Sequence, residues 1–326
     1  MAMYNEDVKE MKDTLFGLVK NTPLFEKTGV APKSLAVCIV VDGLKPFLST
    51  FDKEGNEGTR EFCAPFFNKD EIWQRFGITN GQYDQEELKE AITNEITKES
   101  ILKNLIGSAR QTKNALKQYE IAHVFETKTN FGLEGIPEMS LLFVVKQNNK
   151  RKLNSHFWFF GGFCKAIVPK HIQLLDVGTK PNDDAIYLLW KAMNTNPNCA
   201  GVAGEIMPMD YSFWNFVVAA QHVEYKFIHI MDKALESSIG FITVLPGAFS
   251  AYRWKSIDGP PLWDDYFRGF KEPHEIDCFH SNIYLAEDRV LCLSLVSKPK
   301  ENNILRYVKS AVATTDVPDS LLKMLA

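Results

Sequence analysis

The chain has 326 residues, 45% apolar and 24% charged, so it can bury a sizeable core like an ordinary globular protein. Its formal net charge of -4 leaves no basic footprint, which excludes nucleic acid as the expected partner. Six cysteines without a CxxC pair, and the lack of a signal peptide or a run of about 18 apolar residues, predict a soluble chain in a reducing environment, with neither a zinc site nor a disulfide framework.

The first predicted element is a helix that begins a few residues into the chain. Val8, Met11 and Leu15 recur at helical spacing, and Asn5 with Glu6 suits the N-terminal end of that helix. Capping alone explains these polar residues. The functional alternative is a nucleotide site, because a helix start that faces a sheet crevice is a ready place for a ligand.

The next predicted element is a strand over 35–41, followed by Asp42 and Gly43. Its continuous β-branched run is typical of a parallel strand covered on both faces. Asp42 either caps a turn or accepts hydrogen bonds from a base or ribose. Residues 68–118 then become charged, with Glu and Lys interleaved, which predicts a solvated helical insertion. Strands over 119–126 and 139–146 follow.

Three adjacent cations, at 150–152, precede an aromatic segment that is predicted to be a helix. Such a group is usually a solvated turn. If that helix enters a sheet crevice, Arg151 or Lys152 can instead hold a diphosphate through charge-assisted hydrogen bonds. The aromatic residues are interpreted as core, and His156 as a satisfied structural histidine.

The predicted strand over 171–175 ends at Asp176, with Gly178 two residues later. An apolar run that ends at a carboxylate occurs three times, at Asp42, at Asp176 and near Glu205. In an open α/β sheet, ligands bind outside the carboxyl ends of the strands. A single Asp there usually caps a turn, but the repetition favours a site where Asp176 binds a divalent cation that bridges phosphate oxygens.

The second half of the chain predicts a helix over 183–193, a strand over 200–206 and a long helix over 213–237. The apolar residues of the long helix share one broad face and are interpreted as core; they are Phe216, Val217, Ala220, Val223, Phe227 and Ile230. Residues 240–253 predict two strands around a Pro246-Gly247 turn, which also leaves small residues where a sugar acceptor could pass.

The last candidate site residues are Glu287, Asp288 and Arg289, which precede an apolar helix. An acidic N-terminal turn with a local ion pair explains them structurally. The chemical alternative is a general base whose neighbours tune its pKa. A final strand is predicted over 305–312, and one α/β domain over 1–326 is the simplest partition.

The order of these motifs closely resembles the catalytic domain of chitin synthases, the processive family 2 glycosyltransferases that polymerise N-acetylglucosamine. The similar blocks are Met-Tyr-Asn-Glu at 3–6, Val-Asp-Gly at 41–43, Lys-Leu-Asn-Ser-His at 152–156, Leu-Leu-Asp-Val-Gly-Thr at 174–179, Leu-Pro-Gly-Ala-Phe-Ser-Ala-Tyr-Arg at 245–253, Leu-Ala-Glu-Asp-Arg at 285–289, Leu-Arg-Tyr-Val at 305–308 and Thr-Asp-Val-Pro at 315–318. Valine stands at 41 where the family usually has serine.

The resemblance implies a GT-A-like α/β fold, with a mostly parallel central sheet flanked by helices. It also implies UDP-N-acetylglucosamine as donor, a chitin or chito-oligosaccharide acceptor, and Mg²⁺ or Mn²⁺ as cofactor. The implied roles are uridine binding by Tyr4, Asn5, Glu6, Asp42 and Gly43; diphosphate binding by Arg151 or Lys152; metal binding by Asp176; catalysis by Asp288 with Glu287 and Arg289; and acceptor contact by Pro246, Gly247, Ala248, Phe249 and Ser250.

The residues suit an inverting transfer to the 4-hydroxyl of a growing β-1,4-linked chain. One base is enough, because it deprotonates the acceptor hydroxyl as that oxygen attacks the anomeric carbon. A metal and a cation then stabilise the charge that develops on the departing UDP.

Two departures from the family pattern lead to further expectations. The chain begins at the Met-Tyr-Asn-Glu block, before which the family has a strand, and it stops before the Gln-x-x-Arg-Trp motif and the membrane helices. It is therefore expected to be an internal portion of an enzyme at the cytosolic face of the plasma membrane, inactive alone and anchored by the missing flanks. A homo-oligomer is left open.

Three rival functions were weighed. One is a UDP-sugar-binding fragment or regulatory relative without turnover. Another is a different processive UDP-sugar polymerase, which the long chitin-type blocks disfavour. A dinucleotide oxidoreductase is disfavoured because no Gly-x-Gly-x-x-Gly follows a strand.

Overall fold

The computed structural model describes residues 1–4, 6–51, 57–68, 70, 122–209, 214–269, 286–298, 301–320 and 322. The insertion that the sequence predicts over 68–118 therefore lies outside the described residues, apart from Asn68 and Asp70. Asn5, a candidate cap and nucleotide ligand, lies outside them as well. Among the described residues, no helix has the length and apolar character needed to cross a membrane.

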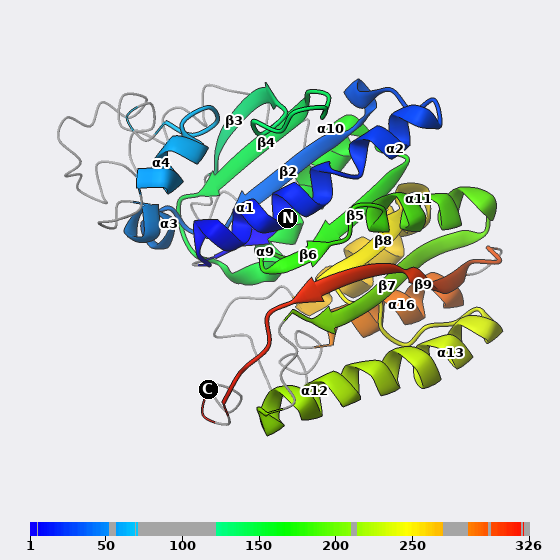
Figure 1. Ribbon diagram of the computed structural model, residues 1–326. Coiled ribbons are helices and arrows are strands. Elements are labelled where there is room, and N and C mark those ends of the chain that lie inside the picture. Colours follow the sequence, from blue (N-terminus) through cyan, green and yellow to red (C-terminus); the bar gives the residue numbers. More distant parts are fainter. Residues whose placement is uncertain are drawn as a thin grey trace.

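Strands and helices alternate along the chain, which confirms the α/β class (Figure 1). The strands are β1 (Ala2–Met3), β2 (Ala36–Val41), β3 (Ala122–Thr129), β4 (Met139–Lys146), β5 (His171–Leu175), β6 (Thr179–Pro181), β7 (Cys199–Pro208), β8 (Phe249–Arg253) and β9 (Ile304–Thr315). The α-helices are α1 (Val8–Val19), α2 (Thr22–Lys27), α3 (Leu44–Phe51), α4 (Glu57–Cys63), α9 (Arg151–Phe157), α10 (Lys165–Ile167), α11 (Ala185–Thr195), α12 (Phe216–Phe227), α13 (Ala234–Ile239), α14 (Trp254–Ile257) and α16 (Glu287–Ser297). Short 3₁₀ segments are η1 (Pro32–Ser34) and η5 (Tyr266–Gly269), and π-helical segments are η2 (Trp158–Cys164), η3 (Ile228–Lys233) and η4 (Pro261–Asp265).

The strands form two sheets that meet at a seam. The first has the order β1-β2-β4-β3 and the second the order β5-β8-β7-β9-β6. A parallel bridge between Ala2 and Asp176 connects the sheets, so β1 and β5 lie side by side at the seam. The strand-ending carboxylate Asp176 therefore lies at the boundary between the two halves of the fold.

The prediction of a mostly parallel central sheet is wrong. The pairs β1–β2, β2–β4 and β7–β9 are parallel, but β3–β4, β5–β8, β7–β8 and β6–β9 are antiparallel. A buried strand reads as a continuous apolar run in either direction, so the sequence pattern carried no information on polarity. The connection between β3 and β4 (residues 130–138) is also short enough for an antiparallel pair, whereas parallel neighbours need a longer crossover.

The first helix connects the two sheets. Val8, Met11 and Leu15 of α1 are buried, as their spacing predicted, but the N-cap is Asp7, whose side chain accepts a hydrogen bond from Lys9 N. Gly17 comes so close to the second sheet that a Cβ there would meet the Pro181 carbonyl oxygen at 2.6 Å. Only glycine allows that approach, which brings α1 against β6.

Residues 2 and 3 form the short strand β1, which pairs with Val40 and Val41 of β2. The first strand was expected to be missing, and β1 is a two-residue strand ahead of Tyr4.

Residues 241–248 form a loop, so the strand that was predicted ahead of the Pro246-Gly247 turn is wrong. Some backbone donors of this segment bond to side chains, and Phe241 N donates to the Glu236 carbonyl oxygen at 3.3 Å. Thr243 N donates to Glu236 Oε2, and Leu245 N to Cys292 Sγ. The second predicted strand is present as β8.

The long helix predicted over 213–237 exists as the consecutive segments α12, η3 and α13. Its predicted orientation is wrong. Phe216, Val223, Phe227 and Ile230 were interpreted as core, but they are 84%, 66%, 61% and 49% exposed. The side chains that face the protein include Gln221, His229 and Lys233, which are buried and hydrogen-bonded.

Candidate active site

The predicted site residues converge where β2 and β5 end at the seam. Asp42 follows β2 and Asp176 follows β5, while Lys152 lies in the first turn of α9. Asp288 lies in the first turn of α16, and Gly247 lies in the loop before β8. Residues from five separate parts of the sequence are therefore assembled at one place.

Asp42 is held in a buried ion pair. Its Oδ1 accepts from Lys146 Nζ at 2.7 Å and from the Lys150 backbone N at 2.9 Å. The side chains of Lys146 and Asp42 are only 2% and 7% exposed. Lys146 Nζ also donates to Ser155 Oγ at 3.2 Å. A buried charge needs such partners, so this network fixes the carboxylate at the end of β2.

Gly43 sits at φ 113°, a conformation that favours glycine, and turns the chain sharply after Asp42. Tyr4 follows β1 as Asp42 follows β2, because Met3 pairs with Val41. Tyr4 is 40% exposed. The first two strands therefore place an exposed aromatic ring and a fixed carboxylate after adjacent strand ends.

Lys152 and Asp176 form the second ion pair, with Nζ and Oδ2 2.6 Å apart. Their side chains are 38% and 30% exposed, so this pair stays accessible, unlike the pair at Asp42. Burial lowers the pKa of Lys152, but the charge and hydrogen bond of Asp176, together with Asp288 and Glu287, outweigh it and leave that pKa raised. Lys152 is therefore a firmly protonated cation among three carboxylates.

Asp288 is fixed by the loop before β8. Its Oδ2 accepts a hydrogen bond from Gly247 N at 2.9 Å, and its Oδ1 is buried without a hydrogen-bond partner among the described residues. A Cβ at Gly247 would meet Lys152 Nζ at 3.2 Å and Asp288 Oδ2 at 3.3 Å. Lys152 and Asp288 thus both lie close to Gly247.

The electrostatics of α16 suit a proton acceptor. Burial raises the pKa of Asp288, while the hydrogen bond from Gly247 and the charges of Lys152 and Lys233 oppose the shift. Burial raises the pKa of Glu287 as well, and the charge of Asp288 adds to the effect. A carboxyl whose pKa is raised toward neutrality is a better general base than an ordinary aspartate.

A neutral histidine lies behind this cluster. His156 Nδ1 is 2.5 Å from the Tyr266 hydroxyl, and both residues are buried. Burial lowers the pKa of His156 to about 3, helped by the charge of Lys152. The imidazole is therefore uncharged at neutral pH, in agreement with its interpretation as a satisfied structural histidine.

A family model for a chitin synthase-like glycosyltransferase domain matches residues 84–326. Chitin synthase 3 of Pyricularia oryzae (strain 70-15) is 36% identical over 351 aligned residues, and the alignment covers 100% of this chain. The chain belongs to the chitin synthase family. It spans 34% of the length of that curated relative.

Not all of the site residues that the chitin synthase motifs indicated point toward the cluster. Arg289 is exposed and makes no ion pair with a described acidic residue. Arg151 is also exposed, at the positive φ of 69°, so Lys152 is the cation that reaches the carboxylates. Phe249 and Ser250 of the acceptor block are fully buried in β8.

Two lysines near the carboxylates, Lys146 and Lys233, were not among the site residues predicted from the sequence. Lys146 ends the otherwise apolar strand β4, and a lone charge in that position was a usable signal of a buried ion pair. Lys233 lies on the inner side of the α12–α13 helix, where it donates to Val244 O at 3.2 Å and affects the Asp288 pKa. Nothing in the local sequence separates Lys233 from a solvent-exposed lysine.

The family resemblance implies a divalent metal, and Asp176 is the carboxylate best placed to bind it. Among the described residues, no group of three or more His, Cys, Asp and Glu side chains is placed to hold a metal ion. Mg²⁺ is commonly bound through one or two carboxylates, with waters and substrate phosphates as the remaining ligands. Asp176, accessible and next to Lys152, fits that mode of binding.

The turn after Asp176 contains Gly178, where an added Cβ would meet nothing within 4 Å. Its role is conformational: φ is 90°, and its N donates to Thr14 Oγ1 of α1 at 3.1 Å. The turn after Asp176 is thereby attached to the first half of the fold.

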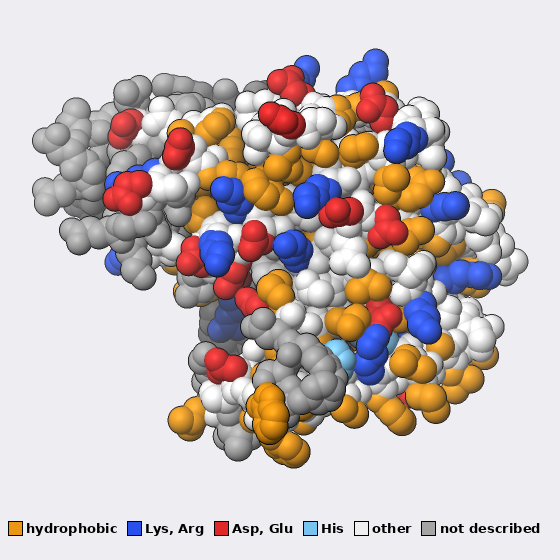
Figure 2. Space-filling view, viewed as in Figure 1, with side chains coloured by type: hydrophobic (Ala, Val, Ile, Leu, Met, Phe, Trp, Pro, Cys, Tyr) orange, Lys and Arg blue, Asp and Glu red, His pale blue; other side chains and the backbone are white. Residues whose placement is uncertain are grey.

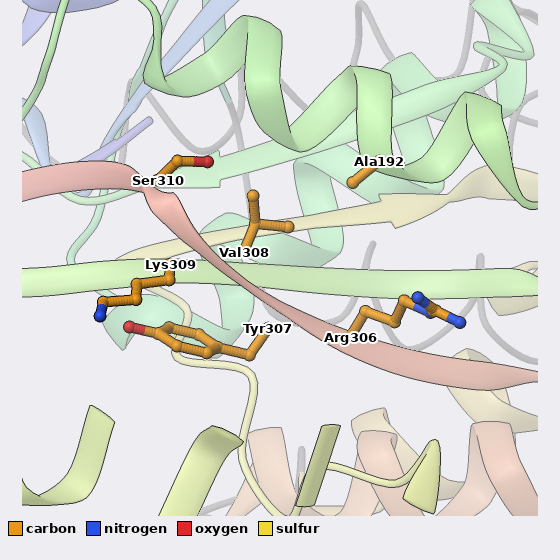
Figure 3. Close-up of a pocket in the computed structure, with 6 residues that line it drawn as sticks. All are labelled: Ala192, Arg306, Tyr307, Val308, Lys309 and Ser310. Carbon is orange, nitrogen blue, oxygen red and sulfur yellow. The ribbon is translucent and has the colours of Figure 1, made fainter. Parts of the chain in front are cut away.

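Two hollows in the described part of the molecule bear on where the site lies. A cavity of about 10 Å³, enough for about one water, lies beneath Asp176 and is lined by Ser155, His156 and Leu174 among others. A much larger open hollow of about 620 Å³ is lined by Ala192 and residues 306–310 of β9 (Figure 3). Because none of the site carboxylates lines it, the larger hollow is not the candidate active site.

Proposed function

We propose that this domain transfers N-acetylglucosamine from UDP-N-acetylglucosamine, with inversion, to the 4-hydroxyl of a growing β-1,4-linked chitin chain. The observation that carries the proposal is the joint placement of Asp288, Lys152 and Asp176 around Gly247 in a chain of the chitin synthase family. A general base, a cation and a carboxylate suited to a metal are the groups such a transfer needs.

The donor is assigned to the end of the first sheet, in a GT-A-like arrangement. Tyr4, Asn5, Glu6, Asp42 and Gly43 contact the uridine. Asp42 suits this role because its Oδ1 is already fixed by Lys146 and Lys150 N, so its carboxylate is held in one orientation before the donor binds. Preorganisation of this kind reduces the entropic cost of binding.

The diphosphate is assigned to Lys152, on the second sheet side of the seam. In the structure Lys152 neutralises Asp176. When a diphosphate enters, Lys152 turns to a phosphate oxygen and Asp176 becomes available as a metal ligand. Mg²⁺ or Mn²⁺ bound there would stabilise negative charge on the departing UDP.

Asp288 is the base in this proposal. Its carboxylate takes the proton of the acceptor 4-hydroxyl as that oxygen bonds to the anomeric carbon and the bond to UDP breaks. The Gly247 N–H holds the carboxylate in place, and burial together with the charge of Asp176 raises its pKa. The neighbouring Glu287 has a raised pKa as well. Arg289 points outward and has no direct part.

The acceptor is assigned to the loop before β8. Pro246 and Ala248 are half-buried beside Gly247. Phe249 and Ser250 support this loop from the core. A glycine at 247 suits this place, because a Cβ there would lie 3.2 Å from Lys152 Nζ and 3.3 Å from Asp288 Oδ2, so both side-chain ends would have to shift.

The alternative of a UDP-sugar-binding protein without turnover has one point in its favour. Lys152 and Asp176 already neutralise each other, which suits storage or sensing of a nucleotide sugar. It leaves unexplained the raised pKa and fixed position of Asp288, which a donor-binding module does not need. A different UDP-sugar polymerase is disfavoured by the family match.

The decisive experiment places this chain in an active context. The matching portion of the Pyricularia oryzae chitin synthase 3 is replaced by the 326 residues, and membranes are incubated with radiolabelled UDP-N-acetylglucosamine and Mg²⁺. Chitinase-sensitive insoluble label is expected, and Asp288→Asn in the same chimaera should reduce it by about 10²–10⁴-fold while preserving donor binding. Polymer synthesis at the unmodified rate by the Asp288→Asn chimaera would remove Asp288 as the base.

Membrane attachment at the cytosolic face of the plasma membrane belongs to the same proposal. A membrane location gives a growing insoluble polymer a path away from the site.

A further inference from the structure

The backbone of Leu245, in the loop before β8, is hydrogen-bonded to two buried side chains. Its N–H donates to Cys292 Sγ at 3.2 Å, and its carbonyl oxygen accepts from the Tyr252 hydroxyl at 3.3 Å. Leu245, Tyr252 and Cys292 are all fully buried. Buried backbone groups need such partners, because no water is at hand to replace them. Leu245 is therefore fixed at both of its backbone polar groups, although it lies in a loop.

The side chain of Leu245 is fixed as well. A Cβ at Gly201 of β7 would lie 2.6 Å from Leu245 Cδ1 and 3.2 Å from Tyr252 Cδ1. A side chain at 201 would push both aside, so the glycine leaves the room that Leu245 occupies. The core of the second sheet thus holds Leu245 through its side chain, in addition to the two hydrogen bonds.

Only Pro246 separates this fixed residue from Gly247. The proline ring restricts φ, and Pro246 O accepts from Phe249 N at 3.1 Å, which closes a tight turn. Little freedom remains at Pro246, so the position of Leu245 determines where the Gly247 N–H points. That N–H donates to Asp288 Oδ2 at 2.9 Å.

Asp288 and Cys292 lie on the same face of α16. They are four residues apart, about one helical turn, and side chains at this spacing lie one above the other. Asp288 accepts from Gly247 N and Cys292 from Leu245 N, so the loop runs along this face of the helix. Cys292 therefore anchors the loop one turn beyond the carboxylate that the loop holds.

A third side chain supports the loop one residue earlier. Lys233 Nζ donates to Val244 O at 3.2 Å. Lys233 lies in η3, between α12 and α13, whose apolar side chains line the lower edge of the molecule in Figure 2, whereas Lys233 itself is buried and directed inward. The loop is thus anchored from three elements, which are η3, β8 and α16.

The thiol of Cys292 has no charge with which to act on the site directly. Burial raises its pKa to about 12, so it is protonated at neutral pH. Its influence on Asp288 can therefore pass only through the hydrogen bond to Leu245. The same holds for the Tyr252 hydroxyl, which is fully buried and bonded to the other side of Leu245.

We propose that Tyr252 and Cys292 are positioning residues for the transfer. By fixing Leu245 they fix the Gly247 N–H, and the Gly247 N–H in turn orients the carboxylate of Asp288. This inference rests on the proposed function, because Asp288 is the base only in that reaction. A role in packing alone would lower stability without a selective effect on the rate of the chemical step.

Hydrogen exchange of the 326-residue chain tests the anchoring without any need for activity. Cys292→Ala removes the acceptor of the Leu245 N–H, whereas Cys292→Ser keeps an acceptor in a side chain little larger than alanine. The Leu245 and Gly247 amides should exchange about 3–10-fold faster in Cys292→Ala and in Tyr252→Phe than in wild type, the worth of one hydrogen bond. Cys292→Ser should stay close to wild type. Cys63→Ala is the matched control, because Cys63 is equally buried but belongs to the core of the first sheet.

Turnover in the chimaera described above tests the consequence. Cys292→Ala and Tyr252→Phe should lower kcat by about 3–10-fold and leave the KM for UDP-N-acetylglucosamine unchanged, because the donor is bound by other residues. Cys292→Ser should restore most of the rate, and Cys63→Ala should leave it unchanged.

Three outcomes would overturn the inference: unchanged exchange of both amides, an unchanged kcat, or a rise in KM as large as the fall in kcat. The Asp288→Asn chimaera separates this failure from failure of the proposed function. If Asp288→Asn is inactive and Cys292→Ala and Tyr252→Phe are fully active, only the positioning role is wrong. Full activity of Asp288→Asn would overturn the proposed function and, with it, the need for any residue that positions Asp288.

Discussion

At the residue scale, the positive charges of two lysines act on the carboxylates of the site. Lys152 is the partner of Asp176 and a nearby charge for Asp288 and Glu287, so it influences all three carboxylates. The charge of Lys233, on the inner side of the α12–α13 helix, also lowers the pKa of Asp288. A change at Lys152 should therefore alter metal and diphosphate binding, whereas a change at Lys233 should alter the pH dependence of turnover.

Lys152→Met should bind Mn²⁺ alone more tightly than wild type, because Asp176 loses the cation that competes with the metal. The same variant should bind UDP more weakly, since the diphosphate loses a charge-assisted donor. Calorimetric titrations with Mn²⁺ and then with UDP measure both. Lys165→Met is the matched control, because Lys165 and Asp258 form an ion pair of the same 2.6 Å length at 41% and 30% exposure. Equal Mn²⁺ affinities for all three proteins would contradict the assignment.

Lys233→Met should raise the pKa of Asp288, because the charge of Lys233 is among the contributions that lower it. A base with a raised pKa is deprotonated only at higher pH. The acidic limb of the kcat/KM profile in the chimaera should therefore move to higher pH. Lys226→Met, which removes a lysine from the same helix that pairs with Glu205, should leave the limb in place. If the acidic limb moved in Lys226→Met but not in Lys233→Met, the role of Lys233 would be refuted.

At the element scale, the short loop before β8 holds the carboxylate of Asp288, the base in the proposed reaction. Its hydrogen bonds to the side chains of Glu236, Cys292 and Asp288 replace those of a strand, which leaves Gly247 N free to hold the base. The loop thus positions the base through its backbone, and a side chain at Gly247 is the most direct way to disturb it.

Gly247→Ala should lower turnover more than donor affinity. The added methyl group would lie 3.2 Å from Lys152 Nζ and 3.3 Å from Asp288 Oδ2, so both flexible ends must shift by a few tenths of an ångström. The loss should be smaller than the about 10²–10⁴-fold expected for removal of the base. Initial rates at saturating donor, compared with the donor Kd, separate the two effects. An unchanged rate would show that the gap at Gly247 has no catalytic role.

Several elements could be predicted from sequence because their burial dictates their pattern. The strand ends at Asp42 and Asp176 were found from continuous apolar runs, and the buried residues of α1 from their helical spacing. The α12–α13 helix was found as well, but its orientation was not. An apolar face normally predicts the core, whereas here hydrogen bonds of His229 and Lys233 to backbone atoms far along the chain determine the rotation.

Side-chain partners across long sequence separations could not be predicted. The pair Lys146–Asp42 and the bond from Gly247 to Asp288 depend on how β4 and α16 approach distant segments. The family motifs named Asp176 and Asp288, and the structure places both near Lys152. They did not separate Lys152 from Arg151, because adjacent residues in a helix point in different directions.

At the scale of the whole molecule, the site lies at the seam of two sheets. Asp42 belongs to the first sheet and Asp176 to the second, and the bridge at Ala2 and the contacts of α1 join them. A ligand that contacts both carboxylates should therefore stabilise the seam as well as the site, since binding to the folded state alone shifts unfolding by mass action.

Buried neutral histidines should make the fold sensitive to acid. Burial lowers the pKa of His156 to about 3 and of His171 to about 4. Below the ordinary value of about 6.5 the unfolded chain binds protons that the folded chain does not, so stability should fall as pH drops from about 6.5 to about 4. The raised pKa values of Asp288 and Glu287 act in the opposite sense and offset part of this loss.

Urea unfolding at pH 7.5 and pH 5 measures that loss. His156→Gln should reduce the difference between the two pH values, whereas Tyr266→Phe should keep it, because burial and not the hydrogen bond is the main cause of the lowered pKa. An identical pH difference in His156→Gln and wild type would contradict the prediction.

The central claim is that Asp176 and its neighbours bind the diphosphate of UDP-N-acetylglucosamine together with a divalent metal. Calorimetric titration of the 326-residue chain with UDP-N-acetylglucosamine and with UDP-glucose, each in Mn²⁺ and in EDTA, tests it most directly. The account predicts tighter binding of UDP-N-acetylglucosamine, a gain in affinity with Mn²⁺, and loss of that gain in Asp176→Asn. Equal binding of both sugars, or the same gain with Mn²⁺ in Asp176→Asn as in wild type, would contradict it.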